Sequence, residues 1–224
     1  LFAASANQDI SLFSNNTFTT LTNAGGLTLN IDGVVDETVC FTTDDHGGAS
    51  SVDLKSGSGS SDSIKLKFSD SSDETWAALL TVDKVETLNI EADNSNSTIT
   101  ASNQSTMTVA LVADDATTIN VTGDGGLNLS SAGSEDLTKV TTVDASGMTQ
   151  AKAAYDGLTY TSKFATINGE TTITGSGGKD FLTGNSMTND TISGGAGVDT
   201  LTYTGGKDSF TGGAGKDVFK LTAV

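Results

Sequence analysis

The chain has 224 residues, 35% of them hydrophobic, which suffices for one large or two small domains with a thin core. A net charge of −17 argues against nucleic acid and anionic membrane surfaces as partners, whereas it suits divalent cations that neutralise crowded carboxylates. The single cysteine, Cys40, excludes an internal disulfide framework, and no apolar run approaches the roughly 20 residues that cross a bilayer.

The first predicted domain, residues 1–84, is a β-rich segment of solenoid type. Short apolar or alternating runs at 28–32, 38–42 and 64–68 predict strands. The loop at 44–48, with two aspartates and the chain's one histidine, His46, is either a further cation site or a solvated turn. A lone histidine excludes an HExxH zinc-protease helix in this segment.

Two further features of this first domain leave alternatives open. The stretch 57–65 is either a decayed calcium turn or an ordinary Gly-Ser hairpin turn. Ser71 and Glu74 have capping-box spacing before a run of helix formers, which predicts a short helix near 73–80. Trp76 in that run belongs to the core or marks a sugar-binding surface.

The second predicted domain, residues 85–170, shows a loose repeat. Segments at 85–90, 116–121, 140–145 and 164–169 share one apolar and polar pattern at intervals of about 24 to 31 residues, with further strands expected at 97–100, 107–112 and 127–129. This pattern predicts coils of a parallel β-helix with two or three strands each, and a β-sandwich is the competitor. Residues 149–155 predict a second helix. The acidic turns at 114–115 and 123–126 either hold calcium or are solvated.

The third predicted domain, residues 171–224, is built from five tandem units of nine residues, one of which has an extra residue. The third and fifth units fit GGxGxDxUx, where U is a large apolar residue. An aspartate ends the turn of each unit, and an apolar residue follows two places later. The aspartates are Asp180, Asp190, Asp199, Asp208 and Asp217.

The repeat has a direct physical meaning. Glycine-rich turns let backbone carbonyls converge, and the aspartate adds a charged oxygen. Two units form one coil, so turns of alternate units stack along the same edge. Oxygen-only ligands with flexible geometry favour Ca²⁺ over zinc or copper.

These units resemble the RTX (repeats-in-toxin) calcium-binding β-roll. The resemblance implies that calcium lies between stacked turns, bound by carbonyls at the second and fourth places of one turn, the first and third places of the next, and both aspartates. It implies one site from Ser176, Gly178 and Asp180 with Gly194, Ala196 and Asp199. It implies a second site from Gly195, Gly197 and Asp199 with Gly212, Ala214 and Asp217. On the opposite side, where the motif is less regular, Asp190 would pair with Thr204, Gly206 or Asp208.

The expected fold class is therefore all-β: a parallel β-helix or β-solenoid that ends in an RTX β-roll, with one or two short helices. No catalytic constellation is present, and the chain is not expected to be an enzyme. The Thr/Ser-rich, proline-free coils joined to RTX repeats resemble the C-terminal part of bacterial surface-layer proteins exported by type I secretion.

That resemblance implies a calcium-dependent structural protein at the cell surface, whose partners are copies of itself and, through further regions of a longer chain, cell-surface polysaccharide. Transmembrane segments and nucleic-acid partners are not expected. The alternatives are a segment of an RTX adhesin and the calcium-folded secretion module of an RTX enzyme or toxin.

Overall fold

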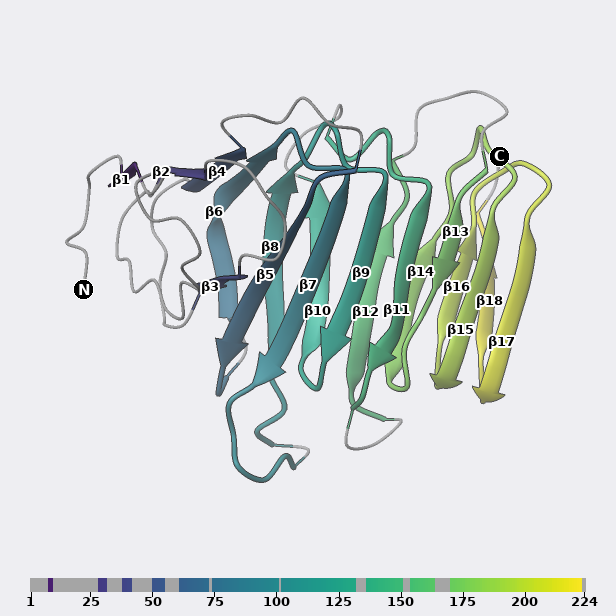
Figure 1. The fold of residues 1–224 in the computed structure, drawn as a ribbon. Helices are drawn as coiled ribbons and strands as arrows, with labels where there is room; N and C mark the ends of the chain where they lie inside the picture. Colours follow the sequence, from purple (N-terminus) through teal and green to yellow (C-terminus); the bar gives the residue numbers. More distant parts are fainter. Residues whose placement is uncertain are drawn as a thin grey trace.

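The computed structural model describes residues 8–9, 28–31, 38–41, 50–54, 61–72, 74–100, 102–131, 136–150, 154–163 and 170–222. In this part of the chain, 18 strands form two parallel sheets and no helix is present. Strand β1 and all even-numbered strands form one sheet, and the other odd-numbered strands form the second. The chain thus alternates between two sheets as a β-solenoid with two strands per coil (Figure 1), which confirms the predicted fold class and excludes the antiparallel sandwich.

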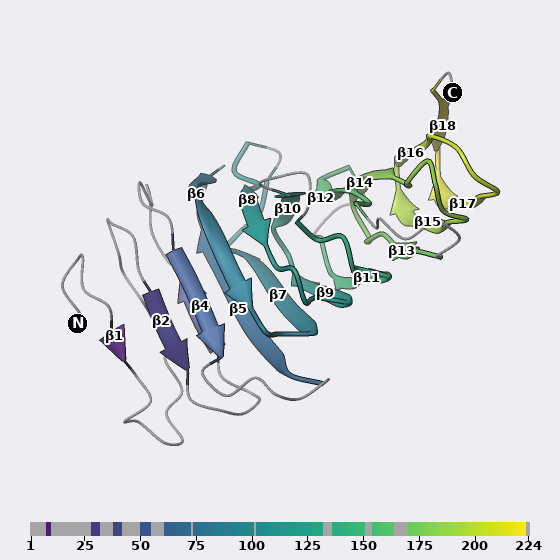
Figure 2. The ribbon, with the colours of Figure 1, turned by 90° about the horizontal axis from the view of Figure 1, so that it is seen from above.

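Within each sheet the strands are arranged in sequence order, so that each strand pairs with the strand one coil before and one coil after it (Figure 2). The ten-stranded sheet contains β1 (Gln8–Asp9), β2 (Thr28–Ile31), β4 (Ser50–Leu54), β6 (Glu74–Asp83), β8 (Thr106–Val112), β10 (Gly126–Ser131), β12 (Asp156–Thr161), β14 (Lys179–Thr183), β16 (Thr200–Tyr203) and β18 (Val218–Leu221). The eight-stranded sheet contains β3 (Thr38–Phe41), β5 (Ser63–Asp70), β7 (Thr87–Asn94), β9 (Thr118–Gly123), β11 (Thr142–Met148), β13 (Thr172–Thr174), β15 (Thr191–Gly197) and β17 (Ser209–Gly215).

The coils before residue 172 are long, and we call them the wide coils, whereas those of the repeat region are shorter, and we call them the narrow coils. Thr87 pairs with Thr118, 31 residues later, and Thr118 pairs with Thr142, 24 residues later. In the repeat region, Thr172 pairs with Thr191 and Thr191 with Ser209, steps of only 19 and 18 residues. The extra residue predicted in the second unit therefore lies between β14 and β15, in the turn, while the strands keep their register.

The core consists of apolar side chains stacked in columns between the two sheets. Every second residue of each strand points inward, and parallel register places equivalent residues above one another. One column, in the eight-stranded sheet, contains Leu88, Ile119, Val143, Ile173 and Ile192. Another, in the ten-stranded sheet, contains Val109, Leu129, Tyr160, Leu182 and Leu201.

The helix predicted near 73–80 is wrong. Residues 74–80 belong to strand β6, in which Glu74 pairs with Met107 of β8 and Leu80 with Ser50 of β4. The helix-forming tendency of this run is overridden because backbone pairing with two neighbouring strands satisfies its hydrogen bonds. The side chain of Trp76 lies outside the described part, so its predicted role is not decided.

Three other predictions have different outcomes. The strand predicted at 97–100 is wrong: this segment is a loop between β7 and β8, in which the Asn103 side chain bonds Thr98 and Thr100. The repeat segment at 164–169 lies outside the described residues, and Ile173 takes the register position expected for it. The helix predicted at 149–155 falls partly on residues 151–153, which are also outside, as are the loop 44–48 and residues 57–60 of the possible turn.

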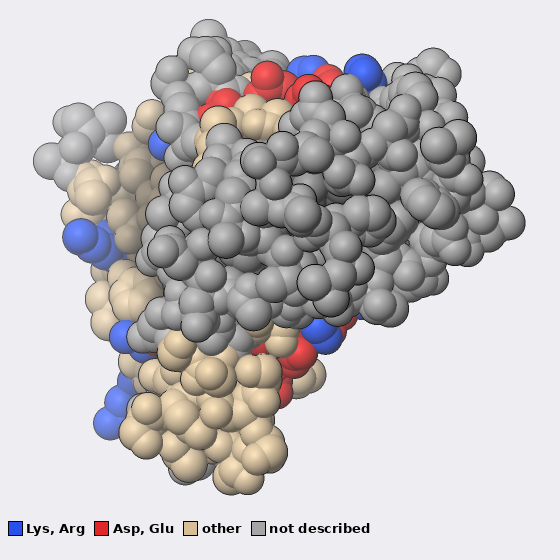
Figure 3. Space-filling view, turned by 90° about the vertical axis from the view of Figure 1, so that its left-hand side faces the viewer, with Lys and Arg blue, Asp and Glu red and all other residues tan. Residues whose placement is uncertain are grey.

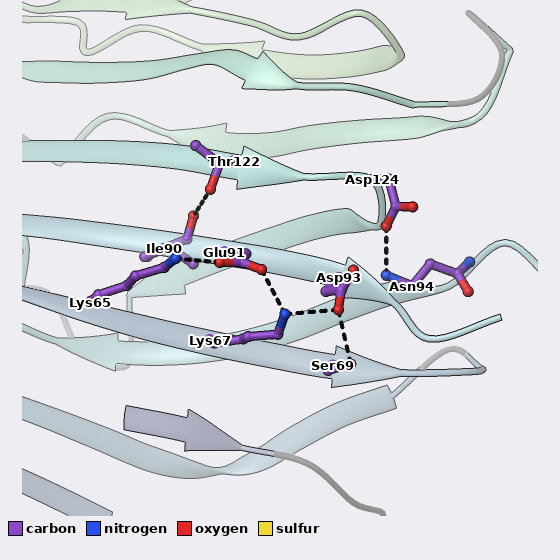
Figure 4. A network of polar contacts seen from close by, with 9 residues as sticks. All are labelled: Lys65, Lys67, Ser69, Ile90, Glu91, Asp93, Asn94, Thr122 and Asp124. Atoms are coloured by element: carbon purple, nitrogen blue, oxygen red, sulfur yellow. Dashed lines mark hydrogen bonds and ion pairs between the residues drawn. The ribbon is translucent and has the colours of Figure 1, made fainter. Parts of the chain in front are cut away.

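The outer face of the wide coils carries a ladder of ion pairs across neighbouring strands (Figure 4). Lys67 of β5 lies 2.6 Å from Glu91 and 2.9 Å from Asp93 of β7, and Lys65 also pairs with Glu91. Burial alone would raise the pKa of Glu91, but its bonds to the two lysines lower it below the ordinary value. Figure 3 shows acidic and basic side chains close together on the described surface at this end. On this face, Glu91 and Asp93 are thus neutralised by lysine.

Ile119→Ala is expected to destabilise the solenoid by about 2–5 kcal/mol, because the side chain is buried between two column neighbours and leaves a cavity. Urea unfolding in saturating calcium measures this loss. Thr118→Ser on the outer face is the control, with an expected change within about 0.5 kcal/mol. Equal effects of the two variants would contradict the column arrangement.

Candidate metal centre

The predicted ligands lie in turns that stack along two opposite edges of the narrow coils. Turns 175–180, 194–199 and 212–217 lead from the eight-stranded to the ten-stranded sheet, and we call them the Asp199 stack. Turns 184–190 and 203–208 lead back, and we call them the Asp208 stack. The sequence prediction that alternate units share an edge therefore agrees with the strand order.

In the Asp199 stack, successive turns are held in register by backbone pairing. Gly195 pairs with Gly213, and Ala196 with Ala214. The Ala196 N–H also donates to the Ser176 carbonyl at 3.0 Å. Equivalent places of the repeat are therefore directly above one another.

Carbonyl groups from both members of a turn pair point into the space between them. The Ser176 and Gly178 carbonyls approach Gly195 and Gly197 so closely that a Cβ at either glycine would collide with them. In the reverse direction, the Gly194 carbonyl approaches Gly175 of the preceding turn in the same way. Positive φ at Gly195 and Gly197 turns the backbone into this arrangement. Second-place and fourth-place carbonyls of one turn thus lie against the next turn, and the first-place carbonyl of the next turn lies against the turn before it.

The aspartates form a directional ladder along the same stack. The Asp180 N–H donates to Asp199 Oδ1 at 2.9 Å, and the Asp199 N–H donates to Asp217 Oδ1 at 3.2 Å. Each carboxylate therefore reaches back to the coil before it. One oxygen of each is fixed by this bond, which leaves the second oxygen to face the convergent carbonyls.

That second oxygen is unsatisfied in the middle of the stack. Asp199 has 0% exposure, and its Oδ2 is buried without a hydrogen-bond partner. Burial raises the pKa of Asp199, and the charge of Asp217 adds to this effect. Burial also raises the pKa of Asp180 to about 6. Buried carboxylates close to one another without a counter-charge are unfavourable, and a cation between the turns would remove this cost.

The Asp208 stack has the same design in a less regular form. The Asp190 N–H donates to Asp208 Oδ1 at 2.9 Å, and Asp208 Oδ2 is buried without a hydrogen-bond partner. Burial raises the pKa of Asp208, and Asp190 contributes through its charge. Gly206 lies directly against the Thr188 carbonyl. Of the three partners predicted for Asp190, the structure brings Asp208 into direct contact with it.

Two side-chain contacts of the turns were not predicted from the sequence. Thr188 donates its hydroxyl to Asp190 Oδ1 at 2.6 Å, and Thr204 donates to the Gly184 carbonyl at 2.8 Å. Thr188 lies within the irregular turn GNSMTND, residues 184–190, in which consensus glycines are missing. A hydroxyl two residues before the aspartate is the signal that could have indicated this contact.

The donor set of both stacks fits calcium. Among the described residues, no group of three or more His, Cys, Asp or Glu side chains could hold a metal. The carboxylates instead come in pairs beside several backbone carbonyls, an all-oxygen environment of the kind that Ca²⁺ prefers. In the Asp199 stack each of the two predicted ligand sets would hold one ion, and in the Asp208 stack Asp190, Asp208 and nearby carbonyls would hold an ion. The individual ligand assignments remain predictions.

Comparison with known families agrees with this chemistry. Two segments, residues 167–186 and 188–209, match the family described as RTX calcium-binding nonapeptide repeat (4 copies). The match covers about a fifth of the chain. No curated protein matches the chain significantly. The chain therefore carries RTX calcium-binding repeats, and the turn 212–217, beyond the matched residues, stacks in register on them.

Asp199→Asn is expected to weaken calcium binding roughly tenfold or more, because Asp199 belongs to both predicted sites of its stack and ligand charge sets affinity. The amide can still accept the Asp180 N–H, so the turn geometry is preserved. Calorimetric titration with calcium measures the change. Asp217→Asn, which affects one predicted site, should have a smaller effect, and exposed Glu170→Gln none. An unchanged titration of Asp199→Asn would contradict the shared site.

Without calcium, the protein should be more stable at mildly acidic pH than at neutral pH. A carboxyl whose pKa is higher in the folded than in the unfolded chain stabilises the fold at low pH, and this contribution disappears as pH rises through the folded value. For Asp180, the change from 3.8 to about 6 corresponds to roughly 3 kcal/mol. Calcium-depleted protein should therefore resist urea better at pH 5 than at pH 7.5.

Calcium affinity should change in the opposite direction, since the ion competes with protons for the same carboxylates. We expect weaker binding at pH 5 than at pH 7.5, measured by titration at both values. A calcium affinity independent of pH would indicate that these buried carboxylates are not ligands.

Proposed function

We propose that this chain is a non-catalytic, calcium-dependent structural protein of a bacterial surface layer, which folds outside the cell and assembles with copies of itself into a lattice. The calcium-binding repeats support the first part of this proposal. With a net charge of −17 and buried aspartates in stacked turns, the metal-free chain is self-repelling, and calcium drives its folding.

The observation that carries the assembly part is the distribution of exposed apolar side chains. Among the described residues, large hydrophobic side chains are exposed at seven positions, and six of them lie in the calcium-binding coils. Phe181, Met187, Val198 and Val218 are four of them, whereas Phe219 and Leu221 continue the positions of Leu201 and Tyr203 in the last strand and are not counted as surface groups. Exposed apolar groups that lie next to each other on a protein surface favour association with another protein surface.

Part of this apolar surface lies on the outer face of the ten-stranded sheet. Phe181 of β14 and Val218 of β18 stand in one register column on either side of Thr200. Lys179 lies 4.6 Å from the centre of the Phe181 ring. Because these strands carry the calcium-binding turns at their ends, calcium would order the apolar column and couple ion binding to self-association.

The location outside the cell rests on the type of repeat, since RTX repeat proteins are typically secreted. The described residues contain no helix long and apolar enough to span a membrane. An extracellular calcium supply would then trigger folding after export.

The proposal predicts two coupled responses when calcium is added to chelator-treated protein. Circular dichroism should show a cooperative gain of β-structure, and light scattering should show growth into particles that electron microscopy resolves as ordered sheets. Folding without growth would overturn the lattice role and favour an adhesin segment or a secretion module. No response at all would overturn calcium-dependent folding.

The double variant Phe181→Thr/Val218→Thr separates the two responses. Threonine already occupies the register neighbours Thr159 and Thr200, so it fits the strand. The variant should fold at the same calcium concentration and assemble more slowly than the parent. Thr183→Ser on the same outer face is the matched control and should assemble normally. Identical assembly of the double variant would show that the apolar column is not the contact.

A further inference from the structure

The first turn of the Asp199 stack differs from the other two in how its aspartate is satisfied. Asp180 Oδ2 accepts the Ser176 N–H at 2.7 Å, and the Ser176 hydroxyl lies 2.8 Å from Oδ1 and 3.1 Å from Oδ2. The Leu158 N–H donates to Oδ1. Both oxygens of Asp180 therefore have protein donors, whereas Asp199 Oδ2 and Asp208 Oδ2 have none.

The serine hydroxyl is fixed from several sides. Ser176 is 4% exposed, and its Oγ accepts the Gly178 N–H at 3.0 Å while it donates to the carboxylate. Gly157 of β12 packs directly on this pair, since a Cβ there would collide with both Ser176 Oγ and Asp180 Oδ1. The arrangement leaves the hydroxyl no other buried acceptor as strong as the carboxylate.

This hydroxyl is present in one turn of the stack only. The second place of the repeat is Ser176 in the first turn, Gly195 in the second and Gly213 in the third. The two glycines supply no side-chain donor, so the aspartates of their turns depend on backbone N–H groups and a cation. The first turn carries a built-in donor at the corresponding place.

The contacts between the first turn and the coil before it are made by backbone groups and a neutral side chain of that coil. Tyr155 O accepts the Lys179 N–H at 2.7 Å, and the Gln150 side chain packs against Gly178. The Leu158 N–H donates to the Asp180 side chain in the same way as the Asp180 N–H donates to the Asp199 side chain. On this side the turn is connected to the preceding coil by neutral groups.

We infer that the Ser176 hydroxyl takes the place of a cation at Asp180 and positions this carboxylate before calcium arrives. The coil of β13 and β14 then folds with the preceding coils and presents a formed half-site, on which calcium orders the turn 194–199. Calcium-dependent folding would begin at Asp199 and proceed toward Asp217. The inference rests on calcium binding by the repeats and is independent of the lattice role.

Amide hydrogen exchange followed by NMR tests this order. In calcium-depleted protein, the Leu158 and Gly178 amides should exchange about 10- to 100-fold more slowly than the Asp199 amide, which bonds to Asp217 in the next turn pair. Calcium should then slow the Asp199 amide by a similar factor. Equally fast exchange of all three amides without calcium would overturn the inference.

Ser176→Ala removes the hydroxyl and keeps the backbone. Its Leu158 amide should lose most of its protection without calcium and regain the parent value with calcium, because the ion replaces the missing donor. Ser176→Gly, which restores the repeat consensus, should behave in the same way.

Ser193→Ala, at a half-buried serine of β15, is the matched control and should leave the Leu158 amide unchanged. Unaltered protection in Ser176→Ala would overturn the role of the hydroxyl. Failure of either Ser176 variant to recover protection with calcium would show that the hydroxyl is needed for the fold itself and does not substitute for the ion.

Discussion

Parallel stacking of successive coils is the constraint on which the rest of the structure depends. It places every residue of the repeat above its equivalent, and columns of like side chains result. For apolar residues such as Ile173 and Ile192 this is favourable, because each covers the next. For aspartates at the turns it is unfavourable, since the buried Asp180 and Asp199 are brought close to each other and Asp217 lies next in the row. The same geometry therefore builds the core and creates the need for a cation.

The wide and narrow coils meet this electrostatic problem by different means. In the wide coils, Lys65 and Lys67 of one strand neutralise Glu91 and Asp93 of the next on an outer face. In the narrow coils, the carboxylates lie at the turns beside carbonyl oxygens and require an external ion. The first calcium turn lies at the junction, and its serine hydroxyl supplies hydrogen bonds where the next turn relies on the ion.

The nine-residue spacing of aspartate and apolar residues was sufficient to predict the roll, its two turn stacks and its ion, because the pattern itself encodes which residues align. The wide coils were harder to predict. Residues 74–80 have good helix formers, and only pairing with strands distant in sequence makes them a strand. The Ser176 contact was also beyond sequence reasoning, since it depends on the close packing of Gly157 from a coil about 20 residues earlier.

The change in coil length has a consequence for how such a chain can vary. The loop between β7 and β8 adds residues to a wide coil while strand pairing on both sides continues, and the single extra residue between β14 and β15 is absorbed in the same manner. A slip of one residue within a strand would instead exchange its inner and outer faces. Insertions and deletions are therefore tolerated at the solenoid edges of the wide coils, whereas in the narrow coils those edges are the ion-binding turns and their length is nearly fixed.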